Sequence, residues 1–276
     1  MLPNLIVIGA QKCGTTSLHY YLSLHPQISM SREKELNFFI FERNWHKGIE
    51  WYKSNFANKA KIYGESSPGY TNYPFFDGVP ERIYSVVPEA KLIYLVRDPI
   101  ERIISHYIHQ YSAGLNRKLS DALKGFDNNR YVCCSKYYTQ LEQYLKYFER
   151  SRILIITQED LYARRLKTLQ EVFRFLDVDD TFYSPKFTNI RLKSSGLRRK
   201  NRFGLFLKQM PGMKVIEQLP SDVRWHFERL LYFPFSQKIE RPVLDESLRR
   251  ELIDYLSDDI NRLREFIGYN FENWCV

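Results

Sequence analysis

A glycine-containing segment near the N-terminus has the composition of a phosphate-binding loop. It reads Gly-Ala-Gln-Lys-Cys-Gly-Thr-Thr-Ser over residues 9–17, between an apolar run at residues 5–8 and a predicted helix over residues 16–24. The first N–H groups of a helix have no intrahelical partner, and the helix dipole adds partial positive charge, so phosphate binds at such a helix start. The segment therefore predicts a phosphate site, with Lys12 as its nearest cation.

The position of that lysine separates the loop from the Walker A pattern, G-x-x-x-x-G-K-[ST]. Thr15 occupies the slot in which Walker A has lysine, and the lysine lies three residues earlier, at Lys12. A nucleoside triphosphatase uses the Walker lysine on the β- and γ-phosphates, so the departure disfavours an ordinary ATPase or kinase. A P-loop nucleoside or small-molecule kinase stays open as an alternative.

The elements that must position this loop follow from the apolar pattern. Unbroken apolar runs at residues 5–8, 91–96 and 153–156 predict buried strands, and residues 62–64 predict a weaker one. Such strands alternating with helices indicate an α/β fold, a P-loop-type parallel sheet flanked by helices on both faces. The predicted helices cover residues 16–24, 100–111, 137–148, 161–176 and 248–267, the last followed by a C-terminal glycine, Gly268.

Composition favours a folded protein with an anionic partner. The 276 residues are 44% hydrophobic and 26% charged, and 41 Lys and Arg against 32 Asp and Glu leave a net charge of +9. We expect one domain over residues 1–276 that binds a phosphate- or sulfate-bearing molecule. A non-enzymatic polyanion-binding protein is the other alternative, and its affinity would fall steeply with salt.

Neither a membrane anchor nor a metal site is predicted. No run approaches the 18 apolar residues of a membrane helix, and no basic stretch followed by an apolar h-region marks a signal peptide. The four cysteines have no C-x-x-C spacing, so neither a disulfide framework nor a zinc site is encoded. We expect free thiols and a cytoplasmic protein.

Several segments, in order along almost the whole chain, resemble the sulfotransferases that use 3′-phosphoadenosine 5′-phosphosulfate (PAPS). The similarity is greatest to heparan sulfate N- and 3-O-sulfotransferases and their bacterial relatives. Residues 9–16 resemble the family's 5′-phosphosulfate loop, and Arg97-Asp98-Pro99 with Arg102 and Ser105 resembles its R-D-P-x-x-R-x-x-S element. Further similar segments are E-L-N-F-F at residues 35–39, H-K-G-I-E-W-Y at 46–52, the helix from Tyr137 to Leu145, and Asn273-Trp274.

The resemblance implies roles in binding PAPS and its product adenosine 3′,5′-bisphosphate (PAP), without a metal. Lys12 would contact the phosphosulfate bridge, and Arg97 and Ser105 would hold the 3′-phosphate, since a guanidinium fits phosphate oxygens bidentately. The other implied cofactor-binding residues are Cys13, Gly14, Thr15, Thr16, Ser17, Tyr137, Ser195, Gly196, Leu197 and Arg198.

The resemblance also implies a general base, Glu35, which takes the proton from the acceptor hydroxyl or amine as it attacks sulfur. Lys12 would neutralise the leaving phosphate. Lys34 and Glu65 are second candidates around the same cleft, and His106 or His109 could approach the acceptor. The acceptor itself stays open among a glycan, a lipid and a small alcohol, with no nucleic acid as partner and the oligomeric state undetermined.

Three departures from the family pattern affect these roles. Asn37 stands where relatives carry His or Gln, and Ser66 stands where many carry lysine after the glutamate. The late loop, commonly S-K-G-R, is here Ser-Ser-Gly-Leu at residues 194–197, within a basic run at 191–202 that otherwise predicts a solvated or anion-binding loop. Arg198 or Arg199 would replace the missing charges.

Overall fold

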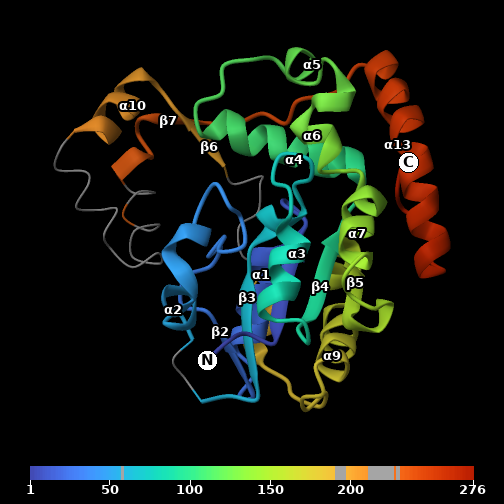
Figure 1. The fold of residues 1–276 in the computed structure, drawn as a ribbon. Helices are drawn as coiled ribbons and strands as arrows, with labels where there is room; N and C mark the ends of the chain where they lie inside the picture. The colour runs from blue at the N-terminus through green and yellow to red at the C-terminus, as the bar shows by residue number, and fades with distance from the viewer. Residues whose placement is uncertain (57–58, 190–196, 211–226, 228–230) are drawn as a thin grey trace.

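The fold is built on a sheet of five parallel strands in the order β2-β3-β1-β4-β5 (Figure 1). The computed structural model describes residues 1–56, 59–189, 197–210, 227 and 231–276. Because β1 is the middle strand, the loop that follows it has neighbouring strands on both sides. The strands are β1 (Leu5–Gly9), β2 (Ile28–Met30), β3 (Ile62–Ser66), β4 (Lys91–Val96) and β5 (Ile153–Thr157).

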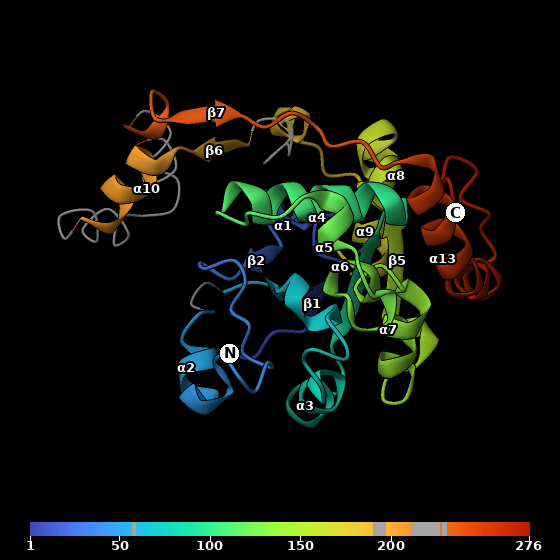
Figure 2. The same ribbon diagram turned by 90° about the horizontal axis from the view of Figure 1, so that it is seen from above.

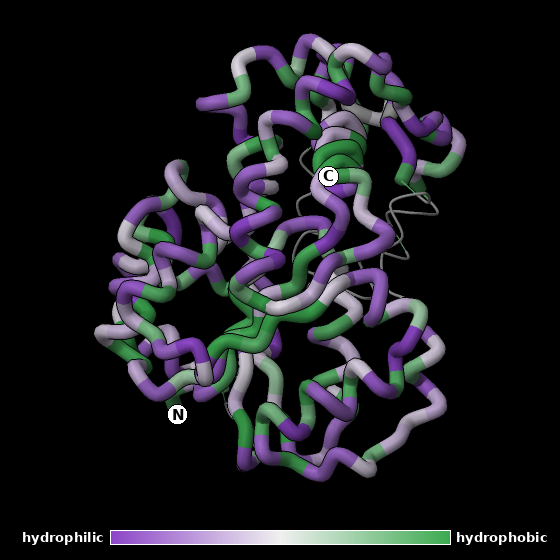
Figure 3. Tube along the Cα trace, turned by 90° about the vertical axis from the view of Figure 1, so that its right-hand side faces the viewer, coloured by the Kyte–Doolittle hydropathy of each residue, from purple (hydrophilic) through white to green (hydrophobic). Residues whose placement is uncertain are grey.

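The central strands are buried on both faces, as their unbroken apolar sequences predict. All five residues of β1 and the last five of β4 are buried. A strand covered on both faces presents apolar side chains in both directions, so its sequence shows no alternation. Figure 3 shows these hydrophobic strands running through the middle of the molecule. The predicted parallel α/β sheet is thus confirmed.

Helices cover both faces of the sheet. On one face, His25, just after α1, lies 4.6 Å from the ring of Phe173 in α9. On the other, Tyr84 of α3 lies 5.5 Å from Phe148, which follows α7. The helices are α1 (Thr15–Ser23), α2 (Gly48–Lys53), α3 (Val79–Val86), α4 (Pro99–Ser112), α5 (Leu119–Ala122), α6 (Arg130–Cys133), α7 (Tyr137–Leu145), α8 (Gln158–Ala163), α9 (Arg165–Phe175), α10 (Arg202–Gln209) and α13 (Glu246–Ile267).

Two elements differ from the sequence prediction. The single helix expected over residues 161–176 is two helices, α8 and α9, because Arg164 leaves the helical region (φ −124°, ψ 40°) and Thr157 starts α8 earlier as its N-cap. Part of the expected basic loop at residues 191–202 forms the strand β6 (Arg198–Lys200). It pairs antiparallel with β7 (Ser236–Lys238), and this two-stranded sheet lies beside α4 (Figure 2).

The long C-terminal helix α13 packs against α4 and α7. Gly268 ends it in the left-handed conformation (φ 72°), as the sequence predicts. Within the described ranges, no helix is both long enough and apolar enough to cross a bilayer.

A buried carboxylate joins α13 to α7. The Asp259 oxygens accept hydrogen bonds from the backbone N–H groups of Tyr138 (2.9 Å) and Thr139 (2.8 Å) and from the Thr139 hydroxyl (2.6 Å). These N–H groups belong to the first turn of α7, which has no side-chain cap of its own. An acidic group from another helix therefore caps α7 and opposes the positive end of its dipole.

We predict that Asp259→Ala lowers the free energy of unfolding by about 1.5–3 kcal/mol, because it leaves buried N–H groups without a partner. Asp258→Ala is the control, since Asp258 is the exposed neighbour on the same helix; its effect should stay within about 0.5 kcal/mol. Urea unfolding of both variants measures the difference. Equal effects of the two substitutions would contradict the capping role.

Candidate functional site

Residues 10–14 form the loop between β1 and α1, at the carboxyl edge of the sheet. Lys12 (φ 73°) and Gly14 (φ 96°) both have left-handed backbone conformations. For a lysine this costs about 1–3 kcal/mol, and strain of this kind clusters at binding sites. The first turn of α1 has no side-chain cap, which is the arrangement of an anion-binding helix start. The loop therefore has a helix start without a side-chain cap, and phosphate binding there stays a prediction.

Two residues that the resemblance implies in cofactor binding, Cys13 of the loop and Tyr137 of α7, have side chains that point away from a ligand. The Cys13 side chain is fully buried, and burial raises the pKa of its thiol to about 11. Its Sγ lies 3.7 Å from the hydroxyl of Tyr137, which is also fully buried and packs its ring near Trp274. The structure therefore corrects the expectation for Tyr137: it supports the loop from the core side, and only the backbone of Cys13 can face a phosphate.

Thr15 and Ser17 are also buried, whereas Thr16 is half-buried. All three lie in the first turn of α1. The Ser17 and Leu18 N–H groups already donate to the Gly14 carbonyl, at 3.0 and 3.1 Å. Thr16 is thus the hydroxyl of this turn with the most access to a ligand.

Arg97, the last residue before the Asp98 cap of α4, contacts the phosphate loop directly. Its Nη1 donates to the Lys12 carbonyl (3.5 Å), and its Nη2 lies 3.1 Å from a Glu101 carboxylate oxygen. Glu101 is shared with Arg241. Ser105 lies within α4, eight residues after Arg97, and is buried. That the two residues together hold the 3′-phosphate stays a prediction.

Arg102 contacts the phosphate loop, and the sequence analysis assigned it no separate role. Its side chain is fully buried, and its guanidinium donates to the carbonyls of Gln11 (3.2 Å) and Tyr131 (2.7 Å) and to the Ser135 hydroxyl (3.1 Å). Among the residues that the structure describes, no carboxylate pairs with it. The available sequence signal was its place in the R-D-P-x-x-R-x-x-S element, in which Arg102 and Ser105 lie three residues apart on α4.

Arg102 also affects the protonation state of His106. Its Nη2 lies 3.0 Å from His106 Nδ1. Burial and the Arg102 charge lower the pKa of His106 to about 2, so the ring is neutral and Nδ1 accepts the hydrogen bond. His106 is buried and therefore does not approach an acceptor, whereas His109 is exposed on α4.

Burial is the main cause of a shift in the pKa of Lys12. Together with the charges of Arg102, Lys34 and Arg97, it lowers the pKa of the amine to about 8. The Glu35 carboxylate acts in the opposite direction and shows that Glu35 lies near Lys12. An anion bound at the loop would stabilise the protonated amine.

Glu35 lies in the segment between β2 and α2 and is exposed, with 46% of its side chain accessible. Its N–H donates to the Ser66 carbonyl at the end of β3 (3.0 Å), and its carbonyl accepts from the Asn37 side chain (2.8 Å). Lys34 Nζ lies 2.6 Å from Glu35 Oε1. Glu35 too has a left-handed backbone (φ 67°). The predicted base is thus held by its backbone while its carboxylate remains accessible.

Glu65 is fully buried on β3 and accepts hydrogen bonds from three hydroxyls: Tyr52 (2.5 Å), Ser67 (2.7 Å) and Tyr70 (2.9 Å). Burial raises the pKa of Glu65, and these hydrogen bonds act in the opposite direction. A general base must reach the proton of the acceptor. The structure contradicts the expectation that Glu65 is a second candidate base.

Glu65 instead connects β3 with the segment that carries Glu35. The Ser67 hydroxyl, which donates to Glu65, also accepts from the backbone N–H of Asn37 (3.0 Å). The buried carboxylate thus helps to hold residues 35–37.

The late loop is described only from Leu197 onward; Ser195 and Gly196 lie outside the described residues. Leu197 packs against an apolar cluster that includes Leu244 and Leu252. Arg198 donates to the Ser236 hydroxyl (2.9 Å) and carbonyl (2.5 Å), so its guanidinium joins β6 to β7. The expectation that Arg198 binds nucleotide is not supported by this orientation. Arg199, on the opposite side of β6, faces α4.

Gln158 and Tyr162 of α8 complete the surroundings of the loop and were not predicted. Gln158 Nε2 donates to the Lys12 carbonyl (3.5 Å), and a Cβ at Gly14 would lie 3.3 Å from it and 3.4 Å from the Tyr162 hydroxyl. The only indication in the sequence was their position, because α8 directly follows the carboxyl end of β5. Segments after β1, β3, β4 and β5 thus meet at one edge, where parallel α/β sheets bind ligands.

Comparison with known proteins agrees with this geometry. A family model described as "Sulfotransferase domain" matches residues 2–195. Heparan sulfate glucosamine 3-O-sulfotransferase 5 of Mus musculus is 36% identical over 191 residues, 64% of this chain and 54% of that protein. Bifunctional heparan sulfate N-deacetylase/N-sulfotransferase 4 of Mus musculus is 33% identical over 207 residues, 68% of this chain and 24% of that protein.

Among solved structures, a sulfotransferase from Alicyclobacillus acidocaldarius has the same fold. It aligns over 99% of both chains with a TM-score of 0.71 at 22% identity. The chain spans about half the length of the 3-O-sulfotransferase 5 relatives that it matches. The family model covers well over half of the chain, and the chain therefore belongs to the sulfotransferase family.

Proposed function

We propose that the chain transfers a sulfuryl group from PAPS to a hydroxyl or amine of a carbohydrate or other alcohol and releases PAP. The observation that carries this proposal is the placement of Lys12, Arg97 and Arg102 around one helix-start loop with an accessible glutamate, Glu35, beside it. The names of the relatives at 33–36% identity support a carbohydrate acceptor.

The residues at this edge fit a doubly phosphorylated nucleotide. The α1 start and Lys12 suit the 5′-phosphosulfate end, and Arg97 before α4 with Ser105 within it suits a second phosphate. The buried Arg102 charge has no carboxylate partner in the described part of the chain, so a bound anion would offset it.

The proposed mechanism is an in-line transfer. The nucleotide, when bound, supplies the sulfuryl group and a phosphate leaving group. Glu35 accepts the proton of the acceptor as the new bond to sulfur forms and the bond between sulfur and the 5′-phosphate oxygen breaks. Protonated Lys12 offsets the negative charge that develops on that oxygen.

We also propose that residues 1–276 form one sulfotransferase domain. Helix α13 lies beyond the segment that the family model matches, yet it packs on α4 and α7 and caps α7 through Asp259. Trp274 reaches the ring of Tyr137 beneath the phosphate loop.

Calorimetry with PAP tests the nucleotide assignment. We expect the protein to bind PAP without a divalent cation and to show no comparable affinity for ATP with Mg²⁺. Arg97→Ala should weaken PAP binding about 10- to 100-fold, because a hydrogen bond to a charged group contributes about 1.5–3 kcal/mol. Arg174→Ala is the control, because the Arg174 side chain is exposed on α9, and it should leave the affinity unchanged. Binding of ATP with Mg²⁺ in preference to PAP would favour the kinase alternative.

The pH dependence of PAP binding tests Lys12. In the free protein the amine loses its proton near pH 8. The dissociation constant for PAP should therefore rise between about pH 8 and 9.5, by at most tenfold per pH unit, since phosphate is already a dianion there. Lys12→Arg stays protonated and should give a flat profile over this range. An unchanged slope in Lys12→Arg would show that another group titrates.

Turnover of Glu35→Gln tests the base. We expect kcat to fall about 10²- to 10⁴-fold, because the amide cannot take the proton of the acceptor, while PAP affinity is kept. The control is Glu33→Gln, the exposed acid two residues earlier in the same segment, which should retain wild-type kcat. Full activity of Glu35→Gln in a radiolabelled sulfate transfer assay would exclude Glu35 as the base.

A further inference from the structure

Helix α10 has an apolar face that is exposed to solvent. Phe203, Phe206, Leu207 and Met210 follow the i, i+3, i+4, i+7 spacing of one helix face, which we call the α10 face. Such a stripe normally packs on a protein core, yet Phe203 is 51% exposed, Phe206 is 60% exposed and Met210 is exposed as well. Figure 2 shows α10 with β6 and β7 at one side of the molecule, apart from the five-stranded sheet. An accessible apolar face of this kind indicates an interaction surface.

The start of α10 is anchored to the segment before β7. The Asn201 side-chain oxygen accepts from the N–H of Gly204 and so caps the helix (2.8 Å), and the Asn201 N–H donates to the Phe235 carbonyl (2.8 Å). The Phe235 ring lies 4.9 Å from that of Phe203, which in turn lies 6.4 Å from Phe206. The exposed phenylalanines therefore belong to a capped helix that is held by backbone and ring contacts.

The segment that contains α10 also carries the charge excess of the chain. Of the 41 Lys and Arg, nine lie in residues 181–216, which contain no Asp or Glu; the other 32 equal the 32 Asp and Glu of the chain. The net charge of +9 is therefore confined to this one segment. Lys12, Arg97 and Arg102 lie outside it, so the excess is not explained by the proposed nucleotide site. A segment with this charge attracts an anionic partner.

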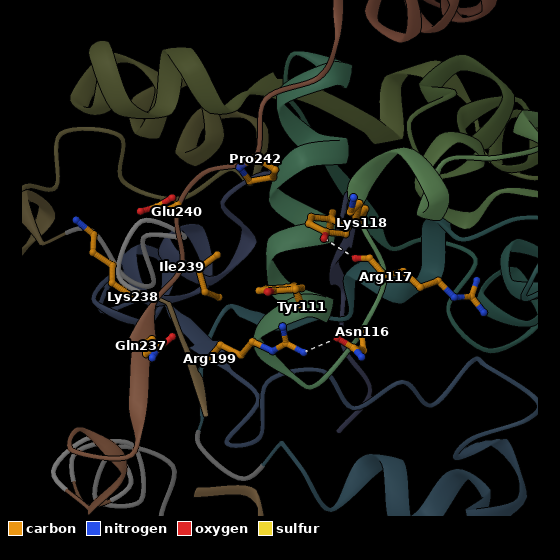
Figure 4. A pocket seen from close by; sticks show the side chains of 11 residues that line it. Tyr111, Asn116, Arg117, Lys118, Arg199, Gln237, Lys238, Ile239, Glu240 and Pro242 are labelled. Carbon is orange, nitrogen blue, oxygen red and sulfur yellow. Dashed lines mark hydrogen bonds between the residues drawn. The ribbon is translucent and has the colours of Figure 1, made fainter. Parts of the chain in front are cut away.

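Strand β6 presents its cations in two directions. The Arg198 guanidinium lies 4.4 Å from the ring centre of Phe233, whose side chain is exposed. Arg199 points instead toward Tyr111 and Asn116 on the α4 side (Figure 4). This alternation along the strand places Arg198 beside an exposed aromatic ring and away from α4.

An anionic membrane surface matches both the charge and the apolar face. Phenylalanine and methionine side chains on one face of a basic helix enter the boundary between lipid headgroups and acyl chains, while Lys and Arg stay at the headgroups. A second copy of the chain fits less well, because two segments with this charge repel each other. A soluble polyanion would offset the charge but leave the phenylalanines exposed.

We propose that the α10 face is a docking surface for an anionic lipid bilayer. Phe203, Phe206 and Met210 enter the boundary between headgroups and acyl chains, and the cations of residues 181–216 contact the acidic headgroups. The helix lies on the bilayer and does not cross it. The proposal concerns where the protein is held and does not depend on which group it transfers.

Co-sedimentation of the full chain with lipid vesicles, without nucleotide or acceptor, tests the surface. The chain should bind phosphatidylcholine vesicles that contain about 30% phosphatidylserine, and bind pure phosphatidylcholine vesicles about tenfold or more weakly. The double substitution Phe203→Ser and Phe206→Ser should lower the affinity for the acidic vesicles about 30-fold or more, because it removes the apolar side chains that enter the bilayer. Phe41→Ser is the matched control, since Phe41 is 64% exposed in the segment between β2 and α2, and it should bind like wild type.

A fluorescence measurement keeps the test valid if the double variant does not fold. Phe206→Trp retains an aromatic ring, and its added fluorescence should be quenched by vesicles that contain brominated lipids, whereas that of Phe41→Trp should not. Equal quenching in the two variants would overturn the docking surface. Wild-type vesicle affinity in the double serine variant would also overturn it, as would failure of the wild-type chain to bind the acidic vesicles. A dimer in solution that dissociates on the double substitution would assign the α10 face to a second copy of the chain instead.

Discussion

The hydrogen bonds of the buried Arg102 guanidinium are the interaction on which the arrangement of the site depends. They join the phosphate loop, through Gln11, to the turn around α6, through Tyr131 and Ser135. The arginine belongs to α4, the helix that also carries Ser105 and follows Arg97. A fully buried cation is costly without an opposing charge. Its burial beside Lys12 is consistent with the multivalent anion that we propose binds at the loop.

Backbone strain and buried polar contacts together define the two sides of the proposed reaction centre. Lys12 and Glu35 both have positive φ values, which residues with a Cβ rarely adopt. The Lys12 carbonyl is held by Arg97 and Gln158, and the backbone N–H of Glu35 is held by Ser66. These contacts offset the strain, so the amine and the carboxylate are presented from a rigid backbone.

Much of the fold could be predicted because the pattern is local. The unbroken apolar runs identified the core strands, and Gly268 marked the end of α13. The break between α8 and α9 at Arg164 could not be predicted. The pairing of β6 with β7 could not be predicted either, since a three-residue basic strand has no apolar signal. In the site, Lys12, Arg97 and Glu35 were identifiable by motif, whereas Gln158 becomes visible only when the ends of β1 and β5 meet at one edge.

By itself, the sequence determined the core strands β1, β4 and β5, the phosphate loop with its displaced lysine, and an excess of cations. Only the tertiary structure decided what each side chain faces. It buries Glu65 among three hydroxyls and places Tyr137 behind the loop. It also directs Arg198 toward Ser236 of β7, whereas Arg199 faces α4. The physical reason is that residue type and spacing specify local conformation, whereas burial and charge pairing depend on segments far apart in the chain. The Arg102 hydrogen bond to Gln11, across 91 residues, is such a contact.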